Sequence, residues 1–215
     1  MIQVVIADDH PVVRVGLKRI VADQPDMTVS AEAATSQELM ECLGKVPCDV
    51  VLLDISMPGR GGLEALAELR RQHPKVAVLV LSVYPEEQYG PRVLRLGAAG
   101  YINKDAASDE IVHAIRKACA GGKYVSPKLA ERIAADLSAN ARLPAHETLS
   151  QREFQVMRLI ASGKTVSQIA RELSLSKKTV STHRARLLEK MRLKTNADLT
   201  FYAIQNELID LSSTK

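Results

Sequence analysis

Short apolar runs alternate, along the first 121 residues, with segments that carry apolar side chains at helical spacing. The run Val50–Leu53 is apolar at every position, which is typical of a strand covered on both faces of a sheet. Strands that are separated by amphipathic helices pair in parallel. The pattern therefore predicts an α/β domain over residues 1–121, with a doubly wound, five-stranded parallel sheet. The predicted strands are Gln3–Ala7, Thr28–Ala33, Asp49–Leu53, Val76–Leu81 and Gly100–Ile102.

Strand signals end near residue 149, and helix start signals replace them. Two capping boxes open the first two helices, and Gly163 is the predicted C-terminal cap of the first. The pattern predicts a small all-α domain of four helices over residues 149–211. The boxes are Ser150-x-x-Glu153 and Thr165-x-x-Gln168, the third helix is predicted at Ser176–Met191, and the fourth at about 196–206.

Residues 122–148 are predicted to join the two domains. Ser126-Pro127 opens a helix to about Leu137, because proline is favoured at the first helical position. The stretch 138–148 is polar, rich in alanine and contains a proline, which is the composition of a linker. The chain should therefore hold two folded domains joined by a helix and a linker.

The charge of the chain is unevenly distributed. Residues 1–121 carry 13 Lys and Arg against 16 Asp and Glu, whereas residues 122–215 carry 16 against 9. Within residues 150–194 the excess is 11 against 3. A basic C-terminal part is the electrostatic pattern of a nucleic-acid-binding module, although an idle basic surface would give the same counts.

The longest apolar runs are far shorter than the roughly 18 residues that a membrane span requires, and no leader precedes the first strand, so we expect a cytoplasmic protein with no membrane partner. The chain has three cysteines, Cys42, Cys48 and Cys119, and no pair has C-x-x-C spacing. This favours reduced thiols over disulfides or a zinc site. We assign these thiols no function.

Charged and hydroxyl side chains lie where the predicted strands end. Ligands of an open parallel sheet bind beyond the carboxyl ends of its strands, so these side chains should converge on one rim. Each residue alone is explained as a helix cap or a solvated charge, but together they favour a binding site. They are Asp8 and Asp9 after the first strand, Asp54 after the third, Ser82 after the fourth and Lys104 after the fifth.

Clustered carboxylates raise one another's pKa unless a cation neutralises them. Mg²⁺, a hard ion that prefers oxygen ligands, is the expected occupant. The bound ion would shield an incoming phosphoryl group and leave Asp54 able to act as the nucleophile that forms an acyl phosphate.

The residues at these strand ends resemble those of a response-regulator receiver domain of the NarL/FixJ type, which implies a flavodoxin-like fold. The resemblance is carried by Val4–Gly16 (V-V-I-A-D-D-H-P-V-V-R-V-G), Asp54-Ile55-Ser56-Met57-Pro58, Gly62-Leu63 and Lys104. It implies that Asp54 is the phospho-acceptor, Asp8 and Asp9 the metal-binding pair, and Lys104 the phosphoryl-binding lysine. It also implies that Ser56 offers its backbone carbonyl to the metal, with Ser82 as the switch hydroxyl and Tyr101 as the switch aromatic.

The chain departs from that pattern in two places. Asp105 follows Lys104 where proline is usual, and the stretch Gly59-Arg60-Gly61-Gly62 makes the loop after Asp54 rich in glycine. Both differences concern the geometry of loops and leave the proposed chemistry unchanged.

The helix predicted at Ser176–Met191 is the most basic element of the chain. Apolar positions on it and on the preceding helix have helix-turn-helix spacing, which presents the second helix to the major groove of double-stranded DNA. An ordinary antiparallel helix pair is the alternative, and the charge asymmetry weakens it. The shared apolar positions are Ile169, Ala170, Leu173, Leu175, Val180, Leu187, Leu188 and Met191.

This second domain resembles the LuxR-type DNA-binding domain. The motifs are Leu149-Ser150-x-Arg152-Glu153, Gly163, Ile169-Ala170, Leu175-Ser176-x-Lys178-Thr179-Val180 and His183, while Val166-Ser167-Gln168 replaces the more usual Asn-Lys-Glu. The resemblance implies DNA contacts from exposed positions of the recognition helix. We expect Lys178, Ser181, Thr182, Ala185 and Arg186 near bases or phosphates, and Arg184 and Lys190 on phosphates. Val180 should pack in the core, and His183 stays open between packing and a backbone contact.

The sequence thus predicts a phosphorylation-controlled transcription regulator of a two-component system. It would take a phosphoryl group from a sensor histidine kinase and bind double-stranded DNA as a homodimer, with RNA polymerase as a further candidate partner. Its only chemistry would be on itself, so we expect no enzyme activity on other substrates. The cognate kinase, the target genes and the sign of regulation stay open.

Three other functions fit the sequence less well. A haloacid-dehalogenase phosphatase also uses an aspartyl nucleophile but needs an acid two residues later, where this chain has Ser56. A ligand-sensing regulator would need a pocket, and an aromatic content of 3% with no tryptophan offers little for one. A nucleotide-binding protein would carry G-x-x-x-x-G-K-[ST], which is missing.

Overall fold

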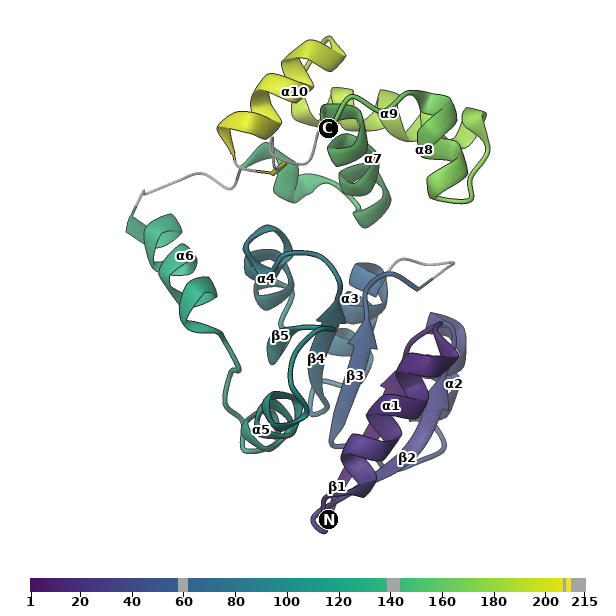
Figure 1. Ribbon diagram of the computed structural model, residues 1–215, viewed down its shortest axis with the longest axis vertical. Coiled ribbons are helices and arrows are strands. Elements are labelled where there is room, and N and C mark those ends of the chain that lie inside the picture. Colours follow the sequence, from purple (N-terminus) through teal and green to yellow (C-terminus); the bar gives the residue numbers. More distant parts are fainter. Residues whose placement is uncertain (58–61, 139–143, 207, 210–215) are drawn as a thin grey trace. The chain divides into compact units, whose positions relative to one another are not determined.

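The computed structural model describes residues 1–57, 62–138, 144–206 and 208–209, and it divides the chain into two compact units, 1–140 and 141–215 (Figure 1). Pro58, the glycine-rich stretch 59–61, the middle of the predicted linker and the end of the predicted second domain lie outside the described residues. Within the described part, none of the helices has the length and apolar character needed to cross a membrane.

The first unit contains the predicted parallel sheet. Its strand order is β2-β1-β3-β4-β5, and all neighbouring strands are parallel, which confirms the predicted α/β class. The strands are β1 (Ile2–Ala7), β2 (Met27–Ala33), β3 (Val50–Asp54), β4 (Ala77–Ser82) and β5 (Gly100–Asn103). Every residue of β3 is buried, as its unbroken apolar run predicts.

Helices cover both faces of this sheet (Figure 1). The helices α1 and α5 pack over one core, in which Leu17 and Val21 of α1 and Ile111 and Ile115 of α5 meet alternate strand residues. The opposite face carries α2, α3 and α4. The five helices are α1 (Pro11–Ala22), α2 (Ser36–Leu43), α3 (Gly62–Gln72), α4 (Glu86–Arg95) and α5 (Ser108–Cys119).

The helix predicted after Ser126 is observed as α6 (Pro127–Ser138), and it packs against α4 within the first unit. Leu129 of α6 is fully buried. A Cβ atom added to Gly90 of α4 would lie 2.6 Å from the Cδ2 atom of Leu129. The Ser126 hydroxyl donates to Glu86 at 2.6 Å, and Lys128 pairs with Glu87. A glycine in α4 therefore provides the space that the leucine of α6 fills.

The second unit is the predicted bundle of four helices, α7 (Gln151–Ala161), α8 (Val166–Glu172), α9 (Lys177–Met191) and α10 (Asn196–Gln205). Both predicted capping boxes are present, and Gly163 has a positive φ of 81° just after α7. The predicted linker differs at its end, because Ala145–Thr148 form a short 3-10 helix. His146 in this turn is buried, with its Nδ1 2.9 Å from the Tyr202 hydroxyl. This tertiary contact orders residues whose composition alone predicts a linker.

The three cysteines are free and half-buried, as the absence of paired spacing predicts. Burial, reinforced by the charge of Asp49, raises the pKa of Cys48 to about 12 and that of Cys119 to about 11. Both thiols therefore stay protonated and weakly nucleophilic at neutral pH.

Candidate functional site

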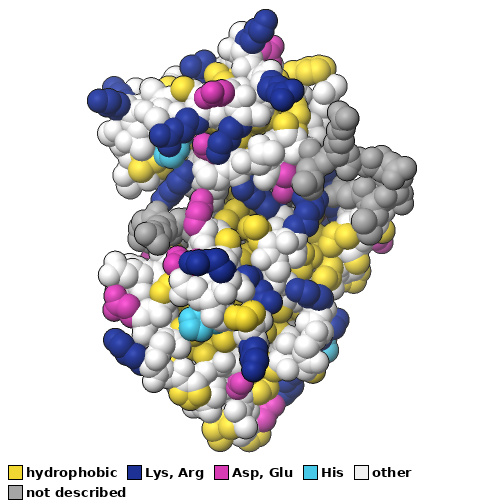
Figure 2. Space-filling view, turned by 180° about the vertical axis from the view of Figure 1, so that it is seen from behind, with side chains coloured by type: hydrophobic (Ala, Val, Ile, Leu, Met, Phe, Trp, Pro, Cys, Tyr) yellow, Lys and Arg dark blue, Asp and Glu magenta, His cyan; other side chains and the backbone are white. Residues whose placement is uncertain are grey.

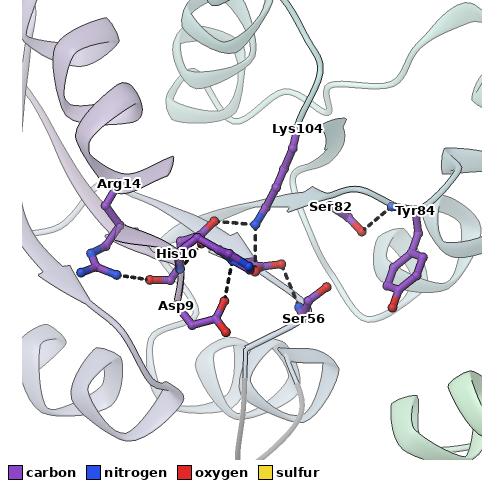
Figure 3. Close-up of polar contacts among 9 residues, drawn as sticks. Asp9, His10, Arg14, Ser56, Ser82, Tyr84 and Lys104 are labelled. Carbon is purple, nitrogen blue, oxygen red and sulfur yellow. Dashed lines mark hydrogen bonds and ion pairs between the residues drawn. The ribbon is translucent and has the colours of Figure 1, made fainter. Parts of the chain in front are cut away.

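The structure brings the predicted carboxylates and lysine together at the carboxyl edge of the sheet (Figure 3). Asp8, after β1, and Asp54, at the end of β3, both have fully buried side chains. The Lys104 ammonium reaches in from the end of β5 and lies 2.6 Å from Asp8 Oδ2 and 2.9 Å from Asp54 Oδ2. The backbone N–H of Ser56 donates to the other Asp54 oxygen at 2.8 Å.

The charges in this cluster are unbalanced. Burial, assisted by the nearby charge of Asp8, holds the pKa of Asp54 above its usual value in spite of the Lys104 ammonium and the Ser56 N–H. Burial alone would lower the pKa of Lys104, but the two carboxylates outweigh it and raise that pKa. One lysine therefore neutralises two buried carboxylates only in part, and a further cation would be stabilised here.

The donor set fits a divalent cation. One ligand atom each from Asp8, Asp9, His10 and Asp54 lies within 4.8 Å of all the others. Three of the four offer carboxylate oxygens, the ligands that Mg²⁺ prefers. The acidic cluster can therefore hold a metal ion. His10 was not among the predicted site residues, although its position directly after the acid pair was visible in the sequence; its Nδ1 lies 2.9 Å from Asp9 Oδ1.

Ser82 is the last residue of β4, and Tyr101 lies within β5. The strand register puts both side chains on the same face of the sheet. The backbone N–H of Lys104 donates to the Ser82 carbonyl at 2.8 Å, which joins two of the predicted residues directly. The Tyr101 ring is buried, and its hydroxyl donates to the Tyr84 carbonyl at 2.6 Å. Tyr84 in turn stacks on Tyr89 of α4, with ring centroids 4.9 Å apart. Contacts thus continue from the strand ends to α4.

The second unit presents a polar, basic face on α9. Figure 2 shows more Lys and Arg side chains than Asp and Glu on the visible surface of this unit. Val180 is buried together with Leu187, Leu188 and Met191, which confirms the predicted packing side of α9. The residues predicted near bases or phosphates, Lys178, Ser181, Thr182, Ala185 and Arg186, are all exposed.

Two predicted phosphate contacts already have protein partners. The Nε of Arg184 donates to the Asn196 side chain at 2.7 Å, and the Lys190 ammonium donates to Glu153 at 2.7 Å. Glu153 is buried, and the same oxygen accepts the backbone N–H of Ser150 at 2.8 Å. These residues are far apart in the sequence, so local patterns gave no signal for either pair.

His183, left open by the sequence, is half-buried, and among the described residues its Nδ1 has no hydrogen-bond partner. Burial lowers the pKa of His183, and Arg186 and Arg152 act in the same direction against the opposing charge of Glu153. A neutral imidazole packed beside α7 is the resulting state at neutral pH.

The Glu153–Lys190 pair predicts a pH dependence of stability. Burial raises the pKa of Glu153, but Lys190 and the Ser150 N–H outweigh it and leave that pKa below the ordinary 4.5. A lowered folded-state pKa stabilises the fold above pH 4.5, and this stabilisation is lost as pH falls through the folded-state pKa. Denaturant unfolding of the second unit should lose stability below about pH 4.5 more steeply in the wild type than in Glu153→Gln.

The exposed Glu189 provides the matched control, since Glu189→Gln should keep the wild-type slope. Equal slopes for Glu153→Gln and the wild type would contradict a stabilising role for the pair.

Comparisons with known proteins agree with both halves of the structure. Residues 4–116 match the response regulator receiver domain family, and residues 147–203 match the luxR family of bacterial regulatory proteins. The chain is 36% identical over 214 residues to the response regulator GacA of Pseudomonas aeruginosa, covering 99% of this chain and all of that one. It is 36% identical over 209 residues to the response regulator UvrY of Escherichia coli K12, covering 97% and 96%.

Solved structures resemble nearly the whole chain as well. One is RcsB from Salmonella enterica serovar Typhimurium, bound to a promoter in the presence of the phosphomimetic BeF₃⁻, with a TM-score of 0.63, 29% identity, and coverage of 94% of this chain and 97% of that one. Another holds two RcsB dimers on two parallel DNAs, with a TM-score of 0.60, 28% identity, and coverage of 94% and 98%. The chain therefore belongs to the response regulators that join a receiver domain to a LuxR-type DNA-binding domain.

Proposed function

We propose that Asp54 is the phospho-acceptor of this response regulator and that a sensor histidine kinase supplies the phosphoryl group. The observation that carries the proposal is the buried Asp54 carboxylate, which shares the Lys104 ammonium with Asp8 at the carboxyl edge of the sheet. An Asp54 oxygen would form the new P–O bond while the P–N bond to the histidine breaks. Lys104 would then pair with the phosphoryl oxygens, and Ser82 would donate its hydroxyl to them.

The same site would hold Mg²⁺ through Asp8, Asp9, Asp54 and the backbone carbonyl of Ser56. The clustered carboxylate oxygens and the raised pKa of Asp54 support this assignment. A bound divalent ion neutralises carboxylate charge and the charge of a transferring phosphoryl group. The chain acts chemically only on itself in this proposal, in keeping with a family of DNA-binding regulators.

The second unit would bind double-stranded DNA through α9, with the protein acting as a homodimer. The exposed basic face of α9 supports the DNA contact, and the similar solved structure with two RcsB dimers on two parallel DNAs supports the dimer. In a bacterium this function belongs to the cytoplasm, where the chromosome lies. A contact with RNA polymerase would decide whether the bound regulator activates transcription.

Salt dependence tests the DNA-binding surface. Arg184→Ala or Lys190→Ala should weaken binding to every DNA sequence and reduce the slope of log affinity against log salt by about one, because each removes about one phosphate contact. Fluorescence anisotropy over a salt series measures both effects.

The exposed Lys117 on α5, in the other unit, is the control, and Lys117→Ala should keep the wild-type slope. Since Lys190 also pairs with buried Glu153, thermal unfolding of each variant is measured in parallel. Unchanged slopes in both folded variants would remove Arg184 and Lys190 from the interface.

A further inference from the structure

Arg14 is a charged side chain that the proposed phosphorylation chemistry does not use. It lies on the first turn of α1 and folds back toward the loop between β1 and α1 (Figure 3). Its Nη1 donates to the backbone carbonyl of Asp8 at 2.6 Å, and its side chain is only 19% exposed. Its Nε lies 3.6 Å from Glu32 on β2, which also pairs with Lys18 at 2.8 Å. The guanidinium thus joins the acid-bearing loop to β2.

The Asp8 carbonyl is a sensitive point of this loop. It belongs to the peptide group that leads into Asp9, so a donor that fixes this carbonyl also fixes the plane from which the Asp9 side chain starts. The Asp8 side chain is held independently by Lys104 and by the backbone N–H of His10, at 2.6 and 2.8 Å. Among the described residues, the Asp9 carboxylate contacts the exposed ring of His10. Asp9 therefore depends more than Asp8 on the position of its backbone.

The charge of Arg14 works against a metal ion at the same place. A positive group beside a cation site weakens cation binding by Coulomb repulsion, and the charge of Glu32 offsets this only in part. Electrostatics alone therefore predicts tighter metal binding when Arg14 is neutralised, whereas a role in holding the loop predicts weaker binding. The two effects have opposite signs, so one measurement separates them.

We infer that Arg14 is a positioning residue for the metal site, and that it holds the Asp8–Asp9 peptide so that the Asp9 carboxylate is ready to bind a divalent cation. A planar guanidinium suits this role because it donates to the carbonyl from one nitrogen while another nitrogen pairs with the charge of Glu32. The inference rests on the proposed function, since it concerns the cation that supports phosphorylation of Asp54. Substitution of a residue that orients a metal ligand commonly lowers metal affinity by about ten- to a hundredfold.

Mn²⁺ binding to the full chain tests the inference without any phosphorylation step. The electron paramagnetic resonance signal of free Mn²⁺ disappears on binding, so titration gives the dissociation constant directly. Arg14→Gln should weaken Mn²⁺ binding by about tenfold, although it removes a positive charge. Arg14→Lys should be intermediate, because a single ammonium cannot reach both the carbonyl and Glu32.

Lys18→Gln is the matched control. It removes an equal positive charge that pairs with the same Glu32. In the described part of the chain no hydrogen bond joins Lys18 to the loop, so Mn²⁺ binding should stay unchanged or become slightly tighter. Thermal unfolding without metal shows whether each variant is folded, and Arg14→Lys keeps the test valid if Arg14→Gln is not.

The outcomes separate the inference from the function on which it rests. If the wild type binds Mn²⁺ and Asp9→Asn loses it, the proposed metal site stands. Unchanged or tighter binding by folded Arg14→Gln or Arg14→Lys would then overturn the role of Arg14 alone. A wild type that does not bind Mn²⁺ would overturn the metal site and the positioning role together.

Discussion

Intact-mass measurement of Asp54→Asn after incubation with acetyl phosphate and Mg²⁺ should show no added phosphoryl group, whereas the wild type should gain one. The amide has no carboxylate oxygen to attack phosphorus, so the loss should be complete. The substitution conserves size and keeps an oxygen that can accept the Ser56 N–H, now found 2.8 Å from Asp54 Oδ1. The fold should therefore survive, and the loss reports on chemistry alone.

Two controls sharpen this experiment. EDTA should suppress modification of the wild type, because the carboxylate cluster needs a divalent cation to accept a phosphoryl anion. Asp109→Asn, at an exposed position in the first turn of α5, should be modified as fully as the wild type. Full modification of Asp54→Asn, or an EDTA-treated protein that reacts unchanged, would show that the acceptor or the metal dependence has been assigned wrongly.

DNA affinity of the full-length protein should rise about 5- to 150-fold when beryllofluoride and Mg²⁺ mimic phosphorylation, since coupling between two sites typically amounts to about 1–3 kcal/mol. An anion on Asp54 attracts both the Ser82 hydroxyl and the Lys104 ammonium. We expect the resulting shift of the fourth and fifth strand–helix units to release the DNA-binding domain and to favour dimers. Anisotropy titrations with and without the mimic measure the change, with Asp54→Asn as the unresponsive control.

The structure supplies a route within the first unit for this effect. The Tyr101 hydroxyl binds the Tyr84 carbonyl, Tyr84 stacks on Tyr89, and Gly90 beside it contacts Leu129 of α6. The Tyr101 ring is buried in this arrangement. The mimic would stabilise an arrangement that these contacts permit.

A fragment of residues 143–215 separates release from dimerisation. If the receiver restrains the DNA-binding domain, the fragment should bind DNA more tightly than the unmodified full chain and should ignore the mimic. A fragment that binds no better would exclude release and leave dimerisation as the mechanism. A full-length protein that ignores the mimic would contradict coupling altogether.

The elements of this fold were predictable because their signals are local. The unbroken apolar run of β3 and the hydroxyl-to-carboxylate spacing at Ser150 each involve only a few neighbouring residues, and both appear where they were predicted. The meeting of Asp8, Asp54 and Lys104 was also predictable, because parallel strands bring their carboxyl ends to one edge.

The features that escaped prediction depend on contacts between distant segments. Lys190 pairs with Glu153 across 37 positions, and the 3-10 turn at Ala145–Thr148 is ordered by Tyr202 of α10. Arg14 lies only six positions from Asp8, but its contact is with a backbone carbonyl, which no residue type signals. Periodicity predicts which side of an element is buried, and it does not predict which polar atoms then meet.

The packing of α6 against α4 limits where two such regulators can be joined to make a chimera. Leu129 fills the space above Gly90, so the sequences of the two helices are matched to each other although one lies beyond the end of the parallel sheet. A chimera joined near residue 121 would combine α4 from one parent with α6 from another and set a foreign side chain against that glycine. A chimera that takes residues 1–138 from one parent keeps Leu129 packed against Gly90. The helix α6 therefore belongs to the unit that must be exchanged together with the sheet.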